Sequence, residues 1–137
     1  MNNSDNVYSV SSKLHVKKSE IHGIGVFAAE DIPKGELLEI SRLLKLEWRM
    51  KYQYDKVLRD YSWVSNCQCK ECQTHGQNMF LALGFGSLYN HSDSPNTNME
   101  INYANQTLIV VAKEDIKQGD EVFVSYGANY WKTRSKT

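Results

Sequence analysis

A nine-residue pattern that occurs twice constrains the fold of this chain more than any other feature. Residues 28–36 read AAEDIPKGE and residues 112–120 read AKEDIKQGD. In each copy an acidic pair and an isoleucine follow an apolar run, and a glycine turn precedes the next run. Two copies so far apart do not make a solenoid, which needs a shorter period and at least three units. The pattern therefore predicts two similar corners of one small β-fold.

Short strands account for most of the remaining apolar pattern. Strands are expected near residues 14–16, 25–28, 37–40, 99–103, 107–112 and 121–126. Residues 104–106 would join two of them as a hairpin turn. Residues 47–63 instead carry apolar side chains at roughly helical spacing, which predicts a helix or two short turns. Residues 79–89 are apolar but contain two glycines, which predicts a bent, buried segment.

Length and composition exclude several classes of protein. A chain of 137 residues fits one domain, expected at 13–137 after a flexible segment 1–12. Sixteen basic and sixteen acidic residues cancel, which argues against a uniformly cationic nucleic-acid binder. No apolar run approaches the ~20 residues of a membrane span, and the polar start has no signal-peptide core. We therefore expect no direct nucleic-acid or membrane partner and a cytoplasmic location, or a host nucleus for a viral protein or an effector.

Three short motifs carry residues suited to chemistry. His22–Phe27 contains G-x-G, which lets a backbone approach a ligand, although an ordinary tight turn would look the same. The second motif, 90–96, reads NHSDSPN and is either a surface loop or a polar cluster at the mouth of the preceding apolar segment. The third, 122–127, ends a strand with a tyrosine, for which core packing is the default interpretation.

In this order the three motifs resemble those of the SET-domain protein-lysine N-methyltransferases, over residues 14–131. Residues 83–86 (LGFG) and 125–131 (SYGANYW) look most like the minimal single-domain SET proteins of viruses and bacteria. The resemblance implies a mostly β fold, with several small sheets and a knot-like threading of the C-terminal strand. It also implies short helices in a variable insert at about 45–80.

The resemblance assigns roles to individual positions. It implies that S-adenosyl-L-methionine is held by Gly23, Ile24, Gly25, Asn90, His91, Tyr126 and Trp131. Tyr126 is expected to be the catalytic residue, and His91 a binding residue rather than a base. The channel for the substrate lysine is expected to be lined by Tyr61, Met99, Val124 and Tyr130.

The cysteines offer a possible metal site. Cys67, Cys69, Cys72 and His75 lie within nine residues, and thiolate and imidazole are the ligands that zinc prefers. Three closely spaced cysteines are a poor disulfide framework. The alternative is a set of free cysteines in a polar loop. A structural zinc here would fix the insert beside the substrate groove.

The expected function is methyl transfer to a lysine side chain of a protein, with a histone-like tail as substrate. The alternatives are a non-catalytic SET-like module that binds a lysine peptide, and a small zinc-stabilised interaction domain. Related minimal proteins form homodimers, and Trp48 or Trp63 would suit either such an interface or the core. Four acidic residues in or beside the insert are candidates for contacts with a basic tail: Glu47, Asp55, Asp60 and Glu71.

Overall fold

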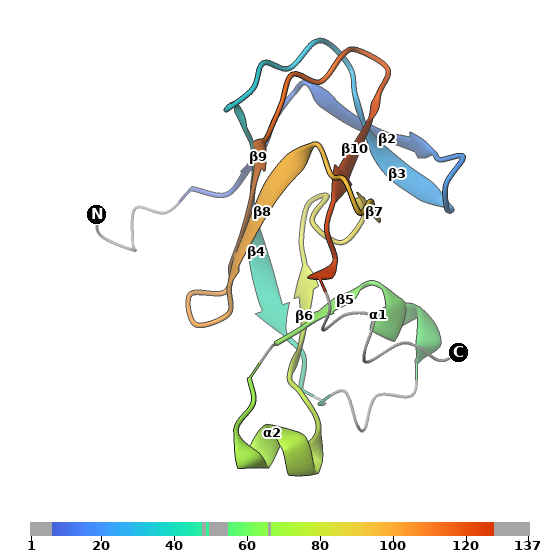
Figure 1. The fold of residues 1–137 in the computed structure, drawn as a ribbon. Helices are drawn as coiled ribbons and strands as arrows, with labels where there is room; N and C mark the ends of the chain where they lie inside the picture. Colours follow the sequence, from blue (N-terminus) through green and yellow to red (C-terminus); the bar gives the residue numbers. More distant parts are fainter. Residues whose placement is uncertain (1–6, 48, 50–54, 66, 128–137) are drawn as a thin grey trace.

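The computed structural model describes residues 7–47, 49, 55–65 and 67–127. This part of the chain forms short strands and two short helices (Figure 1). In chain order the elements are β1 (Ser9–Val10), β2 (Leu14–Lys18), β3 (Ile24–Ala28), β4 (Leu37–Lys45), α1 (Lys56–Asp60), β5 (Ser62–Val64), α2 (Lys70–His75), β6 (Met79–Ala82), β7 (Asn90–His91), β8 (Thr97–Asn102), β9 (Thr107–Ala112) and β10 (Glu121–Val124).

The strands form two sheets. The larger has the order β5-β6-β4-β9-β8, with β1 also paired to β4, and the smaller has the order β2-β3-β10-β7. The pairing of β10 with β7 is parallel, whereas β10 and β3 are antiparallel. The predicted mostly β fold, with several small sheets and short helices, is confirmed. The knot-like threading of the C-terminal strand stays a prediction.

The predicted strands are present, and the 47–63 region is divided. β8 and β9 form the expected hairpin across residues 103–106. Within the described part of 47–63, α1 is a single helical turn capped by Asp55, and Ser62–Val64 is a strand. This single turn agrees with the expectation of short turns, and residues 48 and 50–54 lie outside the described part of the chain. Trp63 lies on β5, paired with Phe80 of β6 and 6% exposed, so it belongs to the core.

The two similar corners pack against each other. Ile32 and Ile116 are almost fully buried, and each donates its backbone N–H to the other's carbonyl at 2.8 Å. The acidic residue before each isoleucine accepts from a backbone N–H of the opposite corner: Asp31 from Gln118 and Asp115 from Lys34, both at 2.8 Å. The repeated pattern thus forms a reciprocal pair, as expected for two related corners of one fold.

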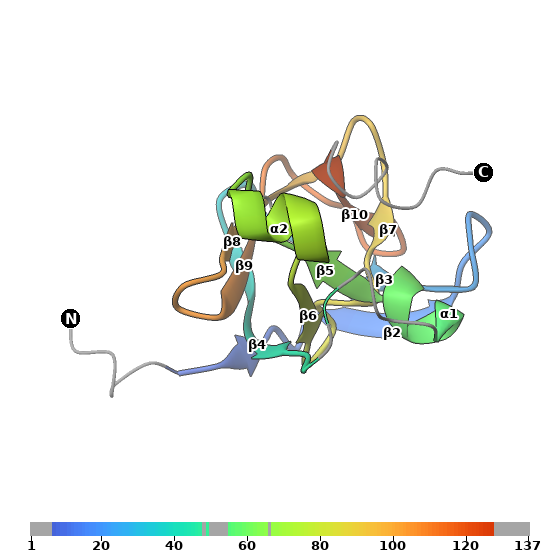
Figure 2. The ribbon, with the colours of Figure 1, turned by 90° about the horizontal axis from the view of Figure 1, so that it is seen from below.

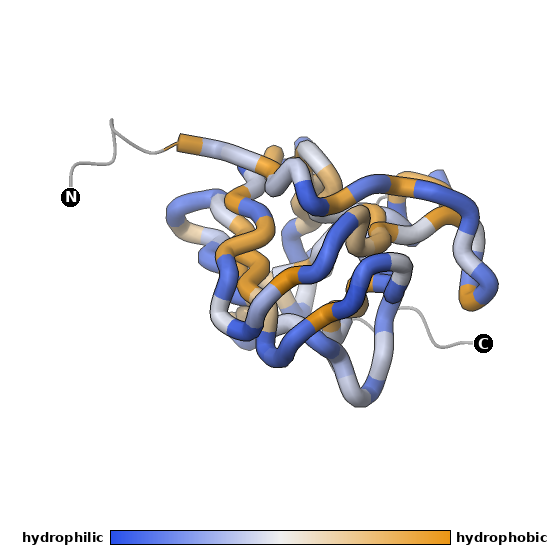
Figure 3. The backbone as a smooth tube through the Cα atoms, turned by 90° about the horizontal axis from the view of Figure 1, so that it is seen from above, coloured by the Kyte–Doolittle hydropathy of each residue, from blue (hydrophilic) through white to orange (hydrophobic). Residues whose placement is uncertain are grey.

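One apolar core lies between the sheets. Its largest cluster includes buried residues from both sheets, among them Val26, Leu43, Leu108, Val122 and Val124. In Figure 3 the apolar segments follow strands through the middle of the molecule, and the projecting loops are mainly hydrophilic. Figures 1 and 2 both place α1 and α2 apart, with β5 between them. Neither of the two described helices could span a membrane, since α1 has five residues and α2 has six.

Candidate active site

Strand β10 brings the three sequence motifs together. Its residues Glu121 and Val122 pair with Phe27 and Val26 of β3, directly after the G-x-G. On its other side Phe123 and Val124 pair with Asn90 and His91 of β7. In the smaller sheet β10 therefore lies between these two strands. Segments about 95 and about 33 residues earlier in the chain are therefore adjacent to β10.

The G-x-G permits a close approach of this backbone to its neighbours. Gly23 has φ +50°, a left-handed conformation that favours glycine. At Gly25 a Cβ would lie 2.2 Å from Oε2 of Glu121 and 2.9 Å from Nδ2 of Asn90. A side chain at position 25 would therefore displace the carboxylate of Glu121 and the amide of Asn90.

Asn90 and Glu121 tie the glycine loop to the rest of the site. The Asn90 amide, almost fully buried, lies 3.2 Å from the carbonyls of both His22 and Ile24 and 2.7 Å from Glu121 Oε2. Glu121 Oε1 accepts from the hydroxyl of Ser19 at 2.8 Å. That hydroxyl in turn accepts from the backbone N–H of Ile21. The loop 19–24 is thus held at both ends by one carboxylate and one amide.

His91 is engaged at both ring nitrogens. Its Nδ1 accepts from the backbone N–H of Tyr126 at 2.9 Å, so the neutral ring carries its hydrogen on Nε2. Nε2 lies 2.8 Å from Oδ1 of Asp93. Asp93 is almost fully exposed, so this contact contributes little stability. Through this hydrogen bond His91 orients the backbone of Tyr126, which is the role of a binding or positioning residue.

The Tyr126 phenol is held by its hydroxyl and by its ring. The hydroxyl donates to the backbone carbonyl of Tyr89 at 2.6 Å. The ring meets the Trp63 indole edge-on, with centroids 5.5 Å apart, and lies 5.2 Å from the His91 ring. The indole nitrogen donates to the carbonyl of Gly86 at 3.3 Å. These contacts leave the phenol few orientations.

A cavity of about 420 Å³ opens between the three motifs and α1. This volume falls within the range of small-molecule sites. Of the residues predicted to bind cofactor or substrate, Ile24, Tyr61, Asn90, His91 and Tyr126 line it. The other lining residues are Ile21, His22, Asp60, Ser87 and Leu88.

Two residues predicted to line the lysine channel do not line this cavity, and their place in a channel stays a prediction. Val124 is fully buried, on the same face of β10 as Val122, and belongs to the apolar core. Met99 packs against the same core from β8, paired with Val110. Neither lines the cavity, because strand alternation turns Val124 inward. Tyr130 and Trp131 lie outside the described residues, as does Trp48.

Sequence reasoning gave no role to several residues that build this site. The sequence around Glu121 and Tyr89 does not indicate which residues they contact. Those contacts are seen only in the folded chain. Asn96 could have been singled out from the sequence, because it is the last residue of the second motif. Its amide donates to the Glu121 carbonyl, and its oxygen accepts from the Phe123 N–H at 2.8 Å. A polar side chain in the motif thus fastens β10.

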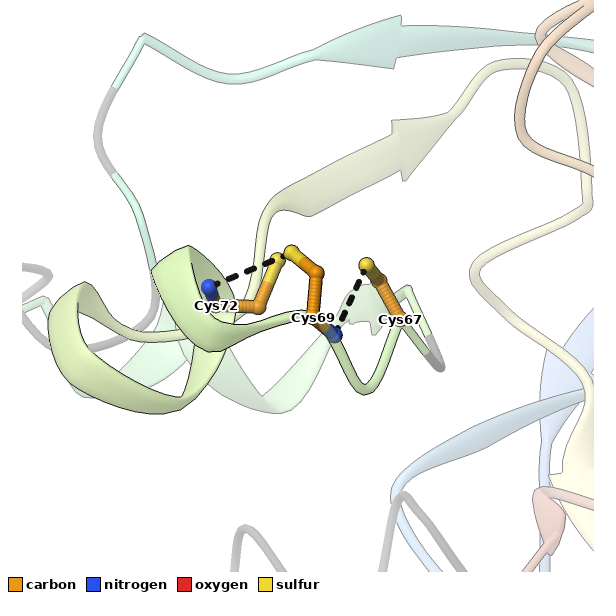
Figure 4. A group of neighbouring side chains, drawn as sticks. All are labelled: Cys67, Cys69 and Cys72. Carbon is orange, nitrogen blue, oxygen red and sulfur yellow. Dashed lines mark hydrogen bonds between the residues drawn. The ribbon is translucent and has the colours of Figure 1, made fainter.

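The three cysteines form a second cluster of candidate ligands (Figure 4). Their sulfur atoms all lie within 4.8 Å of one another. The backbone N–H of Cys69 donates to Cys67 Sγ, and that of Cys72 to Cys69 Sγ, both at 3.4 Å. The hydrogen bond from Cys67 and that from the Cys72 backbone lower the pKa of the Cys69 thiol. His75 is not in this group, because it ends α2 whereas the sulfurs gather where α2 begins.

Comparison with known proteins decides the family. The family model described as the SET domain matches residues 23–127 of this sequence, from the G-x-G through the Tyr126 motif. This chain belongs to the SET-domain family. The identification made from the three motifs is therefore confirmed, as is the enzyme class to which it pointed, the protein-lysine methyltransferases.

Curated and solved SET proteins show the same relationship. The chain is 34% identical over 125 residues to the histone-lysine N-methyltransferase, H3 lysine-37 specific, of Schizosaccharomyces pombe, covering 89% of this chain and 78% of that protein. A crystal structure of a Plasmodium falciparum protein, provisionally named a histone methyltransferase, superposes with a TM-score of 0.64 at 32% identity. It covers 89% of this chain and 99% of the other. A much longer P. falciparum protein, provisionally named histone-lysine N-methyltransferase 1, is 31% identical over 129 residues, 2% of its length. The finer likeness to viral and bacterial SET proteins stays a prediction.

Proposed function

We propose that this SET protein transfers methyl groups from S-adenosyl-L-methionine to the side-chain amine of a lysine in a protein substrate. One observation carries the proposal: the Tyr126 phenol lines the same cavity as the glycine loop, Asn90 and His91. Because its hydrogen is given to the Tyr89 carbonyl, the lone pairs of its oxygen can accept further contacts.

The residues present fit the cofactor. Gly23 and Ile24 offer exposed backbone, and Gly25 is buried beneath the side chains of Glu121 and Asn90, which fix the loop behind them. Asn90 and His91 add polar atoms beside this loop. Tyr126, and in the family resemblance Trp131, would complete the site. When bound, S-adenosyl-L-methionine supplies an electrophilic methyl group on a positively charged sulfur.

Catalysis by the protein would then be positioning and desolvation. The Tyr126 oxygen can accept weak C–H···O contacts that orient a methyl group. A lysine amine has a pKa near 10.4 in water, and entry between the aromatic rings of Tyr61 and Tyr126 would lower it by desolvation. Holding the neutral amine in line with the methyl group adds the proximity contribution. His91 has both nitrogens engaged, which supports binding rather than proton abstraction.

The proposed substrate is a histone tail or a similar basic segment. The S. pombe relative is named for histone H3 lysine 37, which supports this class of substrate. Asp60, which pairs with Lys56 at 2.8 Å, is the one of the four predicted acidic candidates that lines the cavity. It could exchange that exposed partner for a cation of the substrate. Asp60→Asn should therefore raise KM for the peptide more than it lowers kcat.

The test is methyl transfer to mixed histones and a histone-peptide array with labelled cofactor. Wild-type protein should label a lysine, and Tyr126→Phe should lower kcat by about 100-fold or more. Tyr103→Phe is the matched control, because its phenol donates to the Val64 carbonyl in the core, away from the cavity. Equal rates for Tyr126→Phe and wild type would reject the catalytic role of Tyr126.

Calorimetry separates the proposal from its alternatives. Binding of cofactor and peptide without transfer would indicate a non-catalytic module. Absence of cofactor binding would indicate an interaction domain. Asn90, His91 and Tyr126 are all retained in the cavity, which favours the enzyme.

We further propose that Cys67, Cys69 and Cys72 bind a structural zinc ion. The three sulfurs are already gathered within 4.8 Å, so small side-chain rotations would bring each within the ~2.3 Å of a zinc–sulfur bond. The two backbone N–H···S contacts are of the kind that stabilise thiolates. The zinc would supply no chemistry to the cavity, because it would hold α2 and the segment that follows β5.

Metal analysis tests this proposal. Protein purified without chelator should contain about one equivalent of zinc, and Cys69→Ser should lose it. His75→Ala should keep it if three thiolates suffice, and should lose it if the imidazole rotates in as a fourth ligand. Less than about a tenth of an equivalent in the wild type would reject a metal site.

The domain limits, the homodimer and the location stay proposals. Burial of Trp63 removes it from any interface, which leaves Trp48 as the proposed contact. Sedimentation of wild type and Trp48→Ala would show whether a dimer forms and whether this side chain stabilises it. A nuclear or cytoplasmic site follows if histones or other basic proteins are the substrates, and imaging of a tagged protein would locate it.

A further inference from the structure

Glu39 is a buried acid that the proposed mechanism does not use. It lies in β4, in the middle of the larger sheet, with no exposed surface. Within the described residues no lysine, arginine or histidine forms an ion pair with it. Burying an unpaired carboxylate is costly, so its retention calls for a physical reason.

The carboxyl of Glu39 is the centre of a hydrogen-bond network. Its Oε1 accepts from the Tyr89 hydroxyl at 2.6 Å, and its Oε2 accepts from the backbone N–H of Phe85 at 2.9 Å. The hydroxyl of Ser41 lies 2.5 Å from Oε2. Gly84 allows the turn to close over this group, because a Cβ there would lie 2.5 Å from Oε2.

The hydrogens of this network can be counted. The Ser41 hydroxyl is also 2.9 Å from the carbonyl of Leu83, and it has only one hydrogen to give. A protonated carboxyl would satisfy both contacts, by donating to Ser41 while Ser41 donates to Leu83. Burial, the largest effect, raises the pKa of Glu39 and so favours this form.

Tyr89 connects this network to the cavity. The residue is 1% exposed, and its phenol ends at Glu39 while its backbone carbonyl accepts the hydroxyl of Tyr126. A shift of the Tyr89 side chain would move the peptide group that holds the catalytic phenol. Displacements of about 1 Å can cost on the order of 100-fold in rate.

We propose that Glu39 is a positioning residue for methyl transfer, anchoring Tyr89 so that its carbonyl holds the Tyr126 hydroxyl in place. This inference rests on the proposed function. Glu39 and Tyr89 would hold Tyr126 in place from inside the core, whereas Asn90 and the glycine loop would contact the cofactor. Glu39 itself touches neither the cavity lining nor, in this proposal, the substrate.

The variants Glu39→Gln and Tyr89→Phe test it. Each should lower kcat by roughly 10-fold to 100-fold, with a cofactor Kd from calorimetry close to that of wild type. The single oxygen of glutamine cannot accept from both the Tyr89 hydroxyl and the Phe85 N–H, so each variant weakens the same connection. The double variant should therefore lose little more than either alone. Additive losses, or a loss in Kd with kcat retained, would overturn the proposal.

Ser41→Ala is the matched control. It removes a buried hydroxyl that also contacts Glu39 but leaves the Glu39–Tyr89 contact intact. It should lower the melting temperature with kcat near that of wild type. If it lowers kcat as much as Glu39→Gln does, a merely structural role explains both, and the proposal fails.

A readout without catalysis keeps the test independent of the proposed function. In spectra of tyrosine-labelled protein, the Tyr126 ring resonances, assigned with Tyr126→Phe, should shift in Glu39→Gln and not in Ser41→Ala. Unmoved resonances in folded Glu39→Gln overturn the positioning role. A wild type that transfers no methyl to any substrate, with the expected shift present, rejects the proposed function instead.

Discussion

The amide of Asn90 and the carboxylate of Glu121 lie 2.7 Å apart, and together they join the loop before β3 to β7 and β10. Hydrogen bonds to a carboxylate are stronger than neutral ones, and this one also receives the Ser19 hydroxyl. The geometry of the glycine loop therefore depends on a residue outside that loop.

Glu121→Gln should weaken cofactor binding on the order of 10-fold, because an amide has one oxygen acceptor where the carboxylate has two. Calorimetric titration measures the change. Glu100→Gln, an exposed carboxylate on β8, is the control and should bind as wild type does. Equal affinities for the two variants would show that the loop holds its shape without Glu121.

Gly25→Ala should abolish measurable cofactor binding while the chain still folds. The added Cβ would meet Glu121 Oε2 at 2.2 Å and displace it. Gly119→Ala serves for comparison: its φ of +92° strains a turn, yet nothing lies within 4 Å of the new Cβ. Gly119→Ala should lower the melting temperature but leave the affinity for the cofactor unchanged. Retained binding in folded Gly25→Ala would argue against a close backbone approach at this site.

Ile32→Ala should destabilise the protein by about 2–5 kcal/mol, the range for truncating a buried isoleucine. The side chain is 1% exposed where the two corners meet. Ile21→Ala, at a position 64% exposed, should change the free energy of unfolding by less than about 0.5 kcal/mol. Urea denaturation compares them, and a cost below about 1 kcal/mol for Ile32→Ala would contradict the importance of this contact.

The stability advantage of wild type over Glu39→Gln should shrink as the pH rises from about 4.3, the usual pKa of glutamate, toward neutrality. Burial raises the pKa of Glu39, so the folded chain binds more protons than the unfolded one in this interval. Stability contributed by that group is then lost with increasing pH. Taking the difference between the two proteins in urea denaturation cancels the other titrating groups. A difference that stays constant or grows would contradict a raised pKa.

The strands were predictable where several apolar residues follow one another, as in β3 and β9, or alternate with polar residues, as in β8. The two-residue strands β1 and β7 were not, because a pair of residues becomes a strand only through its partner. The resemblance implied short helices in the insert, but the residues gave no position for α2. Its composition is that of a polar loop, and the Cys69 side chain that caps it is an unusual N-cap.

The site was predictable to the extent that its residues lie in motifs. Asn90, His91 and Tyr126 converge as the resemblance implied, although their roles stay predictions. Val124 shows the limit: its position two residues before Tyr126 gives no sign that its side chain is fully buried in the core, and its place in the channel stays a prediction. Glu39 shows another limit, since a single glutamate in an apolar strand gives no sign of the tyrosine 50 residues later that it contacts.

The place of β10 as the common neighbour of β3 and β7 has a consequence for protein synthesis. Both halves of the proposed cofactor site are translated before β10, yet neither can take its final arrangement until residues 121–126 have left the ribosome. At about 5–20 residues per second, the growing chain spends seconds with the glycine loop and the Asn90 loop unjoined. The protein therefore acquires its binding capacity in one late step rather than by degrees.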